Sequence, residues 1–495
     1  MQFNIMMGSS EIFTETIKQL SVDDQINEGL VEDSSDPLSH PSSESFTETL
    51  RQLSIEDQFN EGLVEDSSDP LSRPSSESFT EHLRQLSIES EDQIDEELVD
   101  TLSPISISEA PLCLLVLPTE ILLLIVEFLD AKFVIGTLSL VCKRFYKLVS
   151  QDAVWKMRIR KTFSRQYPFI PVDDRDFDWG QACYEIERDL LLWRNYKDNM
   201  EFYSLNCSHI ASVDAVCLLQ NGDICISGSR DRTMQVWDLR KLNKTLKADS
   251  ACVKSIQAHK GWVWSLTSLG NILCSASWDC WMNFWDIEAD FQKIGSAKGN
   301  SAFLCSILQD DVVIAGSYDK QIYIYDRKDG YALISKLRYH KKPVLCLSAD
   351  EHYIISGSED NTIAVYDRRA NRLLKKVVME AFPMSMSYSN GQLWTGLRNG
   401  NINVLDPTYG KFDIVQNFSV GHTGKITGIA NNVGCIITAS TDRTLKVMTP
   451  CNPVSVLTTL DDQLQELTDL HYLNGVLACG CSDFTCGIWK PKSDS

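Results

Sequence analysis

The sequence predicts a mostly β fold, namely a seven-bladed β-propeller preceded by a small α-helical domain and an acidic N-terminal tail. A strand–turn–strand motif occurs seven times in the C-terminal half, an apolar helix-forming stretch lies between residues 112 and 161, and the first 110 residues are acidic. At 495 residues the chain is long enough for more than one domain. We expect an acidic tail at 1–110, a helical domain at 111–161, a helical linker at 162–200 and the propeller at 201–490.

Each repeat has small residues at a strand end, a tight turn at Asp or Asn, and then an alternating strand. The first copy reads SGSRDRTMQVWD, from Ser227 to Asp238. The seven turn residues are Asp231, Asp279, Asp319, Asp360, Asn399, Asp442 and Asp483, separated by 48, 40, 41, 39, 43 and 41 residues. A period near forty with several short strands in each copy is typical of a β-propeller.

The repeats resemble those of the WD-repeat family, in which His, Ser or Thr, Asp and Trp form one hydrogen-bonded group. Four copies supply most of this group: His209, Ser227, Asp231 and Trp237; His259, Ser275, Asp279 and Trp285; His340, Ser356 and Asp360; His422, Thr438 and Asp442. The last two sets have Tyr366 and Met448 in place of Trp, and copies three, five and seven lack the His. We interpret the group as structural rather than metal-binding or catalytic, because it recurs at one place in a structural repeat.

Charge is distributed unevenly along the chain. Residues 1–110 hold 26 acids and 4 bases, which leaves 42 acids and 42 bases in the remainder. The neutral remainder argues against a nucleic-acid-binding body.

The acidic tail repeats with a period of 33 residues, in which Phe13, Phe46 and Phe79 are equivalent. Each copy has one short helical segment and a Ser/Asp/Pro tract, too little apolar surface for ankyrin or TPR repeats. We expect a disordered tail with transient helices. A multivalent docking or phosphorylation tail is the alternative.

The sixteen cysteines are scattered and show no paired CxxC units with metal-binding spacing. They indicate reduced core thiols in a cytoplasmic or nuclear protein. No secretory signal opens the chain, and no GxSxG, Walker loop or HExxH motif occurs. We therefore expect no enzyme activity, no metal site and no cofactor.

The stretch from Leu112 to Leu129 is apolar enough to raise a membrane helix as an alternative. Glu120 and Glu127 oppose insertion, at about 2.5–3.5 kcal/mol each near a membrane centre. A helix starting at Pro118 is the better interpretation. Val134, Leu138 and Val141 predict a second helix, and Val154, Trp155 and Ile159 predict a third.

These three helices resemble an F-box. The matching residues are the Leu117-Pro118 start, the Glu120-Ile121 pair, the run from Leu138 to Lys143, and Trp155. The resemblance implies docking onto the Skp adaptor and cullin of an SCF ubiquitin ligase, with contacts from Leu117, Pro118, Ile121, Leu122, Ile125, Leu138, Val141 and Cys142. The alternative is that these residues only fill a helical core.

Trp179 to Asn199 predicts a linker helix that couples the helical domain to the propeller. Glu201 to Leu205 predicts a strand. The seventh repeat ends before its outer strand, so we expect this early strand to pair with it and close the ring.

An F-box followed by seven WD repeats is similar to the F-box/WD-repeat substrate receptors of SCF ligases, which implies that the propeller holds the protein to be ubiquitinated. A WD scaffold unrelated to ubiquitin is the alternative. The resemblance also implies that the ligand binds the face formed by the turns and the loops before the first strands. At those positions this chain has the expected substrate contacts Arg230, Trp262, Trp264, Trp278, Tyr318, Phe382, Met384 and Arg398. Because aromatics outnumber Arg there, we predict an apolar or aromatic ligand, with or without one salt bridge, rather than a multiply phosphorylated peptide. The alternative is that some of these aromatics plug the central channel.

Overall fold

The computed structural model describes residues 114, 117–163, 166–170, 177–206, 209–242, 251–461 and 465–492. The predicted acidic tail and its repeats lie outside these residues. The chain divides into two units, Met1–Pro118 and Thr119–Ser495, and every helix and strand below belongs to the second.

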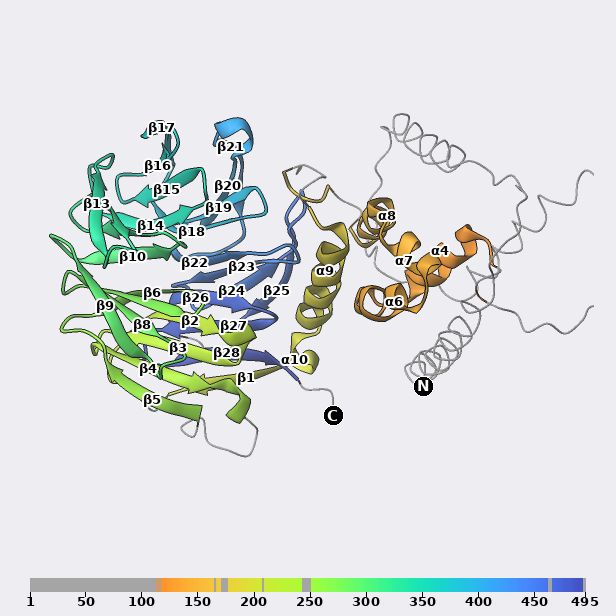
Figure 1. The fold of residues 1–495 in the computed structure, drawn as a ribbon, viewed down its shortest axis with the longest axis horizontal. Helices are drawn as coiled ribbons and strands as arrows, with labels where there is room; N and C mark the ends of the chain where they lie inside the picture. The colour runs from red at the N-terminus through yellow and green to blue at the C-terminus, as the bar shows by residue number, and fades with distance from the viewer. Residues whose placement is uncertain are drawn as a thin grey trace, which may run out of the picture. The chain divides into compact units, whose positions relative to one another are not determined.

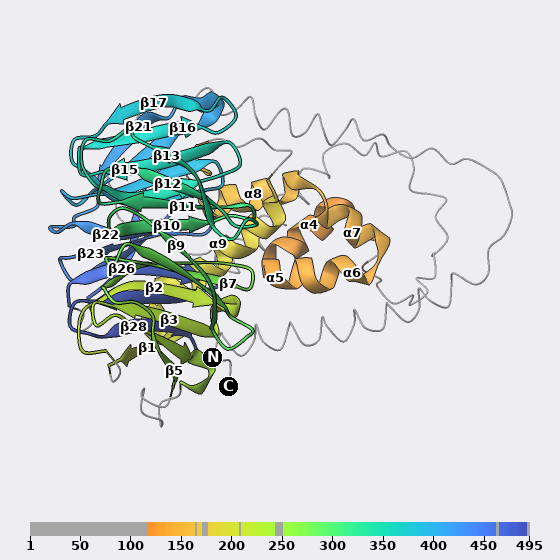
Figure 2. The ribbon, with the colours of Figure 1, turned by 60° about the vertical axis from the view of Figure 1, so that its left-hand side comes forward.

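Seven four-stranded antiparallel sheets form the predicted propeller (Figures 1 and 2). Six of them follow the chain from the inner to the outer strand. Blade 1 contains β2 (Val213–Leu219), β3 (Ile224–Ser229), β4 (Thr233–Asp238) and β5 (Cys252–Gln257); blade 2 contains β6 (Val263–Leu269), β7 (Ile272–Ser277), β8 (Trp281–Asp286) and β9 (Gln292–Lys298); blade 3 contains β10 (Phe303–Leu308), β11 (Val312–Ser317), β12 (Ile322–Asp326) and β13 (Ala332–Leu337). Blade 4 contains β14 (Val344–Ala349), β15 (Tyr353–Ser358), β16 (Thr362–Asp367) and β17 (Arg372–Val378); blade 5 contains β18 (Pro383–Ser389), β19 (Gln392–Leu397), β20 (Asn401–Asp406) and β21 (Asp413–Ser419); blade 6 contains β22 (Ile426–Asn431), β23 (Ile436–Ser440), β24 (Leu445–Met448) and β25 (Val456–Leu460).

Blade 7 takes its outer strand from the N-terminal side of the propeller, as predicted. It contains β26 (Leu467–Leu473), β27 (Val476–Cys481) and β28 (Cys486–Pro491), and β1 (Met200–Leu205) pairs with β28. The register runs from Met200 opposite Pro491 to Leu205 opposite Cys486. The pairing removes an open sheet edge and joins the two ends of the propeller.

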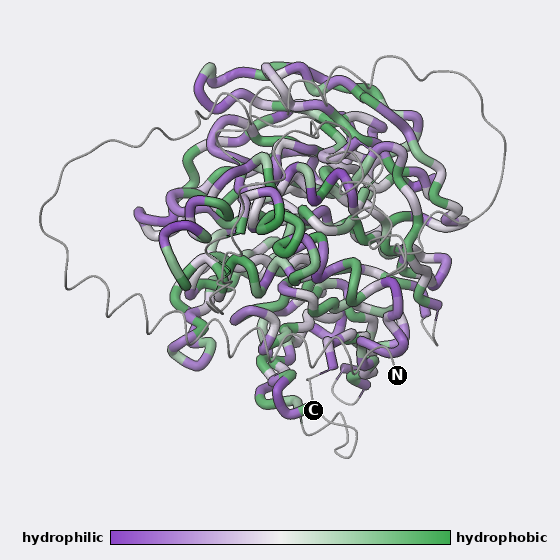
Figure 3. The backbone as a smooth tube through the Cα atoms, turned by 90° about the vertical axis from the view of Figure 1, so that its right-hand side faces the viewer, coloured by the Kyte–Doolittle hydropathy of each residue, from purple (hydrophilic) through white to green (hydrophobic). Residues whose placement is uncertain are grey.

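Neighbouring blades share hydrophobic cores. Between blades 2 and 3, Phe284, Phe303 and Tyr323 are almost completely buried. Burying one such side chain stabilises the fold by roughly 2–3 kcal/mol. A single isolated sheet would lack this stabilisation, because the side chains on its face would stay exposed to solvent. Apolar stretches accordingly alternate with polar ones along the chain, and polar residues gather at the peripheral turns (Figure 3).

The helical domain contains more elements than predicted. It consists of α4 (Thr119–Phe128), α5 (Ala131–Phe133), a π-helical turn η3 (Val134–Leu138), α6 (Ser139–Val141), α7 (Lys143–Val149) and α8 (Asp152–Thr162). The helix starting after Pro118 and those around residues 134–141 and 154–159 are present. Sequence analysis missed α7, although Phe145, Leu148 and Val149 in its sequence KRFYKLV lie at helical spacing and are buried.

The predicted linker helix is α9 (Trp179–Arg194), followed by α10 (Tyr196–Asn199). Asp178 caps α9 by accepting a hydrogen bond from the Gln181 backbone N at 2.9 Å. The α9 helix lies beside β25 (Figure 1), and its Leu192 and Trp193 belong to the core shared with blades 6 and 7.

Residues 166–170, before α9, also contact the propeller, which was not predicted. Phe169 is 3% exposed, and its ring centroid lies 5.5 Å from those of Trp394 and Phe418 in blade 5. The Asn452 backbone N donates to the Gln166 carbonyl at 2.9 Å. The linker therefore contacts the propeller in two places, through residues 166–170 on blades 5 and 6 and through α9.

Candidate functional sites

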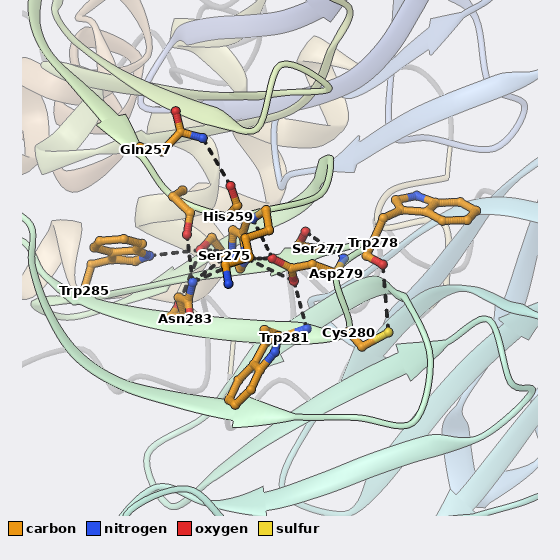
Figure 4. A network of polar contacts seen from close by, with 12 residues as sticks. Gln257, His259, Ser275, Ser277, Trp278, Asp279, Cys280, Trp281, Asn283 and Trp285 are labelled. Atoms are coloured by element: carbon orange, nitrogen blue, oxygen red, sulfur yellow. Dashed lines mark hydrogen bonds and ion pairs between the residues drawn. The ribbon is translucent and has the colours of Figure 1, made fainter.

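Two of the predicted groups of four are complete. In blade 1, His209 Nδ1 lies 2.8 Å from Asp231, His209 Nε2 lies 2.8 Å from Ser227 Oγ, and Trp237 Nε1 donates to the same Oγ at 2.9 Å. In blade 2 the corresponding distances for His259, Asp279, Ser275 and Trp285 are 3.1, 2.8 and 2.9 Å (Figure 4). Each blade thus joins a strand, a turn and a loop by one chain of hydrogen bonds.

Blades 4 and 6 keep three members of the group. His340 lies 3.3 Å from Asp360 and 2.8 Å from Ser356, and His422 lies 2.9 Å from both Asp442 and Thr438. Tyr366, at the Trp position of blade 4, donates instead to Asn371.

The blades without His hold their turns by other bonds. In blade 3, Tyr323 donates from its hydroxyl to Asp319 at 2.6 Å. In blade 5, Asn399 and Asn401 donate to Glu380 at 2.7 and 2.8 Å. Sequence analysis could not identify these substitutes, because neither Tyr nor Glu occupies a position of the motif.

A Ser–His–Asp arrangement suggests hydrolytic chemistry, but its surroundings here favour a structural role. Ser227 and Ser275 are completely buried, so no substrate reaches their hydroxyls. Burial opposes ionisation of Asp279, yet hydrogen bonds from His259 lower its pKa to about 2. Burial also lowers the pKa of His340 and His422. Ionised Asp next to buried neutral His is a stable hydrogen-bonded pair at neutral pH.

The residue before each turn Asp or Asn occupies an equivalent place in all seven blades. Its backbone N donates to the carbonyl of the loop residue just before, or at the start of, the inner strand, at 2.9–3.1 Å. These pairs are Arg230 with Ser212, Trp278 with Trp262, Tyr318 with Ala302, Glu359 with Pro343, Arg398 with Phe382, Thr441 with Lys425, and Ser482 with Glu466. We call the surface formed by these turns and loops the turn face.

Four predicted contact residues form one continuous aromatic surface on blades 2 and 3. The ring centroids of Trp262 and Trp264 lie 5.5 and 5.7 Å from that of Trp278, which in turn lies 5.7 Å from Tyr318. Trp262, Trp278 and Tyr318 are 41%, 36% and 51% exposed. We call these four residues the aromatic ledge. Trp278 points away from the buried His259–Ser275 pair (Figure 4).

Glycine lets the loop of the aromatic ledge approach its turn closely. A Cβ atom on Gly261 would lie 2.7 Å from the backbone N of Asp279. Gly424 occupies the same place in blade 6, where a Cβ would lie 2.6 Å from the backbone N of Asp442. The residues that follow, Trp262 and Lys425, are thereby held against their turns.

Arg230 borders the aromatic ledge, but its charge is already paired. Its guanidinium donates to both carboxylate oxygens of Asp214, at 2.7 and 3.1 Å, and lies 5.1 Å from the Trp262 ring and 5.5 Å from the Trp264 ring. Asp214 is buried, with its side chain 5% exposed. Arg230 therefore supports the two indole rings from blade 1.

The other three predicted contacts lie in blade 5. The Arg398 guanidinium lies 4.9 Å from the Phe382 ring centroid, and Met384 is partly exposed on β18. Within the part of the chain that the structure describes, no ring contact connects this group to the aromatic ledge. The predicted site thus consists of two separate groups.

Two of the predicted adaptor contacts are buried in the helical domain. Leu122 and Leu138 are 2% and 1% exposed, because they form the core between the short helices. Leu117, Ile121, Ile125, Val141 and Cys142 are partly exposed, and Pro118 is exposed. Sequence analysis missed three strongly exposed apolar side chains on the same helices, namely Phe128 (71%), Leu140 (78%) and Tyr146 (59%).

Arg158 and Glu187 connect the helical domain to α9. Arg158 Nε and Nη2 donate to the two Glu187 carboxylate oxygens, at 2.5 and 2.9 Å. The same guanidinium donates to the carbonyls of Val126 and Leu129, at 3.0 and 2.5 Å, and Glu187 accepts from the Ala131 backbone N at 2.9 Å. One ion pair therefore ties α8, the end of α4 and the start of α5 to the linker helix.

A second polar group ties α9 to blades 6 and 7. Asp189 is completely buried and accepts hydrogen bonds from Tyr472 at 2.9 Å and Arg188 at 2.9 Å. The Cys435 thiol lies 3.4 Å from its second oxygen. Burial raises the pKa of Asp189, and the Arg188 charge and the hydrogen bonds oppose that rise.

Among the described residues there is no group of three or more His, Cys, Asp or Glu side chains arranged to hold a metal ion. In the same residues, no helix has the length and apolar character needed to span a membrane.

Comparison with known proteins agrees with both parts of the architecture. Residues 114–161 match the F-box-like family, and residues 202–238, 250–286 and 331–367 match the WD domain, G-beta repeat family. A helical F-box followed by a WD-repeat propeller defines an F-box/WD-repeat protein, as predicted.

Sequence similarity specifies the relationship further. The chain is 39% identical over 389 residues to F-box/WD repeat-containing protein 9 of Bos taurus, covering 77% of this chain and 82% of the relative, and 36% identical over 382 residues to its Homo sapiens namesake, covering 76% and 82%. It is 26% identical over 326 residues to F-box/WD repeat-containing protein mec-15 of Caenorhabditis elegans, covering 63% and 79%. The chain belongs to the family of F-box/WD repeat-containing protein 9.

Proposed function

We propose that this protein is the substrate-recognition subunit of an SCF-type ubiquitin ligase. The F-box helices dock on the Skp adaptor, which connects the chain to the cullin, and the turn face of the propeller binds the protein to be ubiquitinated. The chain itself is non-catalytic and supplies proximity between the bound protein and the ligase. Membership of the F-box/WD-repeat family is the observation that carries this proposal.

Exposed apolar side chains on the F-box helices support the adaptor part of the proposal. Phe128, Leu140 and Tyr146 remain exposed although the domain is folded and attached to α9. Exposed apolar side chains grouped on one small domain are typical of a protein-binding surface. Pro118, Ile121 and Ile125 on α4 and its start contribute to the same domain.

The aromatic ledge supports the substrate part. Trp and Tyr dominate the binding energy of many protein interfaces, because they bury a large area and lose little conformational entropy. Arg230 is neutralised by Asp214, so the described residues of blades 1–3 offer no free cluster of Arg for a multiply phosphorylated peptide. We therefore infer an apolar or aromatic recognition segment in the substrate.

Adaptor binding is tested with the purified full-length chain and the Skp adaptor. Leu140→Asp places a charge at a site that is 78% exposed and should abolish capture of the adaptor and cullin. Leu191→Asp is the matched control, since Leu191 is 69% exposed on α9, and it should bind normally. Normal adaptor capture by Leu140→Asp, together with a normal Leu117→Ala/Pro118→Ala variant, would refute docking through these helices and favour a scaffold unrelated to ubiquitin.

Substrate binding is tested by affinity capture from proteasome-inhibited cells. The double variant Trp264→Ala/Trp278→Ala should lose the proteins that accumulate on the wild-type chain, while its thermal unfolding remains cooperative. Equal capture of those proteins by the wild type and the double variant would show that the aromatic ledge is not the substrate site.

A further inference from the structure

The turn face carries two different kinds of surface. Blades 2 and 3 present the aromatic ledge, and Arg230, which borders it from blade 1, is paired with Asp214. Blades 5 and 6 present Arg398 and Lys425, both exposed. The two kinds of surface are separated in the ring by blade 4 on one side and blade 7 on the other.

Arg398 and Lys425 lie on adjoining loops. A Cβ atom on Gly400, two residues after Arg398, would lie 2.5 Å from the His422 carbonyl oxygen and 3.0 Å from that of Gly424. Lys425 directly follows Gly424, and its backbone N donates to Thr441 Oγ1 at 3.0 Å. The loops that carry the two cations are therefore in contact and fixed by their backbones.

These two cations have no carboxylate partner within the part of the chain that the structure describes. Glu380, on the blade 5 loop, accepts from Asn399 and Asn401 instead, and those hydrogen bonds lower its pKa. One side of the Arg398 guanidinium lies over the Phe382 ring, which limits the rotation of the side chain. Its N–H groups remain available to a planar or tetrahedral anion.

The carboxylates of the intervening blades do not cancel this charge. Glu359 in blade 4 pairs with Lys342 at 3.6 Å, and among the described residues no ion pair joins Glu466 of blade 7 to Arg398 or Lys425. Arg230 beside the aromatic ledge is thus paired, whereas Arg398 and Lys425 across the ring are not. A ligand that covers the face meets an apolar anchor at one end and positive charge at the other.

We propose that the substrate segment is bipartite: a bulky apolar residue binds the aromatic ledge, and an anionic group, a carboxylate or a phosphate, binds Arg398 and Lys425. This inference rests on the proposed function and names the chemistry of its substrate. Arg230 is a positioning residue for Trp262 and Trp264 rather than the residue that binds the anion. Specificity then comes from the spacing between the two groups, because each group alone buries little area.

The test begins with selection of a random-peptide library on the immobilised full-length chain. The wild type should enrich peptides that contain a bulky apolar residue and an acidic residue at a fixed separation. One enriched peptide is then synthesised with Glu, phosphoserine or Gln at the acidic position, and its affinity is measured by fluorescence anisotropy. The Glu or the phosphoserine version should bind about ten-fold more tightly than the Gln version, the effect of one charge-assisted hydrogen bond. Whichever version binds more tightly identifies the anion.

Arg398→Gln/Lys425→Gln should remove that ten-fold preference and leave the affinity for the Gln version within about two-fold of wild type. The control Lys341→Gln/Lys342→Gln removes the same charge from blade 4 and should retain the preference. Enriched peptides without an acidic residue, or an acidic preference that survives in Arg398→Gln/Lys425→Gln, would overturn the bipartite proposal and leave the proposed function intact. Peptide binding that persists in Trp264→Ala/Trp278→Ala would instead refute the aromatic ledge as the substrate site.

Discussion

At the scale of single residues, the Ser at the equivalent position of two blades accepts different hydrogen bonds. Ser275 in blade 2 and Ser356 in blade 4 are both completely buried, and both lie 2.8 Å from a His Nε2. Only Ser275 also receives a hydrogen bond from an indole N–H, that of Trp285 at 2.9 Å. The loss of the hydroxyl therefore leaves an additional buried donor unpaired in blade 2.

We predict that Ser275→Ala lowers the free energy of unfolding by about 1–3 kcal/mol more than Ser356→Ala does, the cost of one buried unsatisfied donor. Urea unfolding of the full-length chain, followed by Trp fluorescence and by circular dichroism, measures the difference. Equal losses in the two variants would show that the Trp285 bond contributes no net stability.

Residue identities could be predicted where they follow the local motif and not where a long-range partner replaces a motif residue. The His, Ser or Thr and Asp of four blades were predicted because their spacing along the chain is nearly constant, with 20–22 residues from His to Asp. The bond from Tyr323 to Asp319 was not, since Tyr is an ordinary strand residue at that position. The aromatic ledge was predicted by residue, but the pairing of Arg230 with Asp214 depends on two strands coming side by side.

At the scale of elements, β1 closes the propeller. It is an outer strand that pairs with β28, and Phe202 packs on the buried Trp489 with ring centroids 4.8 Å apart. In an antiparallel pair, of any two successive residues one exchanges hydrogen bonds with the partner strand. Two successive prolines in β1 must therefore remove at least one ladder bond.

We predict that Tyr203→Pro/Ser204→Pro destabilises the propeller by about 3 kcal/mol and exposes the edge of β28 to other chains. Tyr203→Ala/Ser204→Ala keeps the backbone donors and controls for the lost side chains. Differential scanning calorimetry and size-exclusion chromatography should show a lower melting temperature and self-association for the proline variant alone. Identical behaviour of the two variants would mean that the propeller closes without β1.

The pairing of β1 with β28 could be predicted because the sequence of the seventh repeat lacks one strand. The α7 helix carried a signal, since Phe145, Leu148 and Val149 lie at helical spacing, but no Gly or Pro marks the break at Cys142 that separates it from α6. Residues 166–170 have no apolar periodicity, although Phe169 and Ile170 are buried against blades 5 and 6. Elements whose order comes from the surface they contact cannot be identified from their own residues.

At the scale of the whole molecule, α9 has a polar anchor on each side. Glu187 binds Arg158 of the F-box domain, and Asp189, two residues later, binds Tyr472 of blade 7. The proposed function requires this kind of coupling, because a loose connection would lower the effective concentration of a bound protein near the ligase. The Arg158 side chain is 12% exposed, so its removal leaves Glu187 and two carbonyls poorly satisfied.

We predict that Arg158→Ala destabilises the F-box helices by about 2–3 kcal/mol without melting the propeller. Arg160→Ala on the same helix is the matched control, since Arg160 is exposed and its loss changes the net charge equally. Hydrogen exchange followed by mass spectrometry should show faster exchange in α4 to α8 for Arg158→Ala only, with the strands of blades 1–7 unchanged. Faster exchange throughout the propeller would mean instead that the F-box, α9 and the blades unfold as one cooperative unit. In that case, a mutation that weakens the adaptor side would also weaken substrate binding.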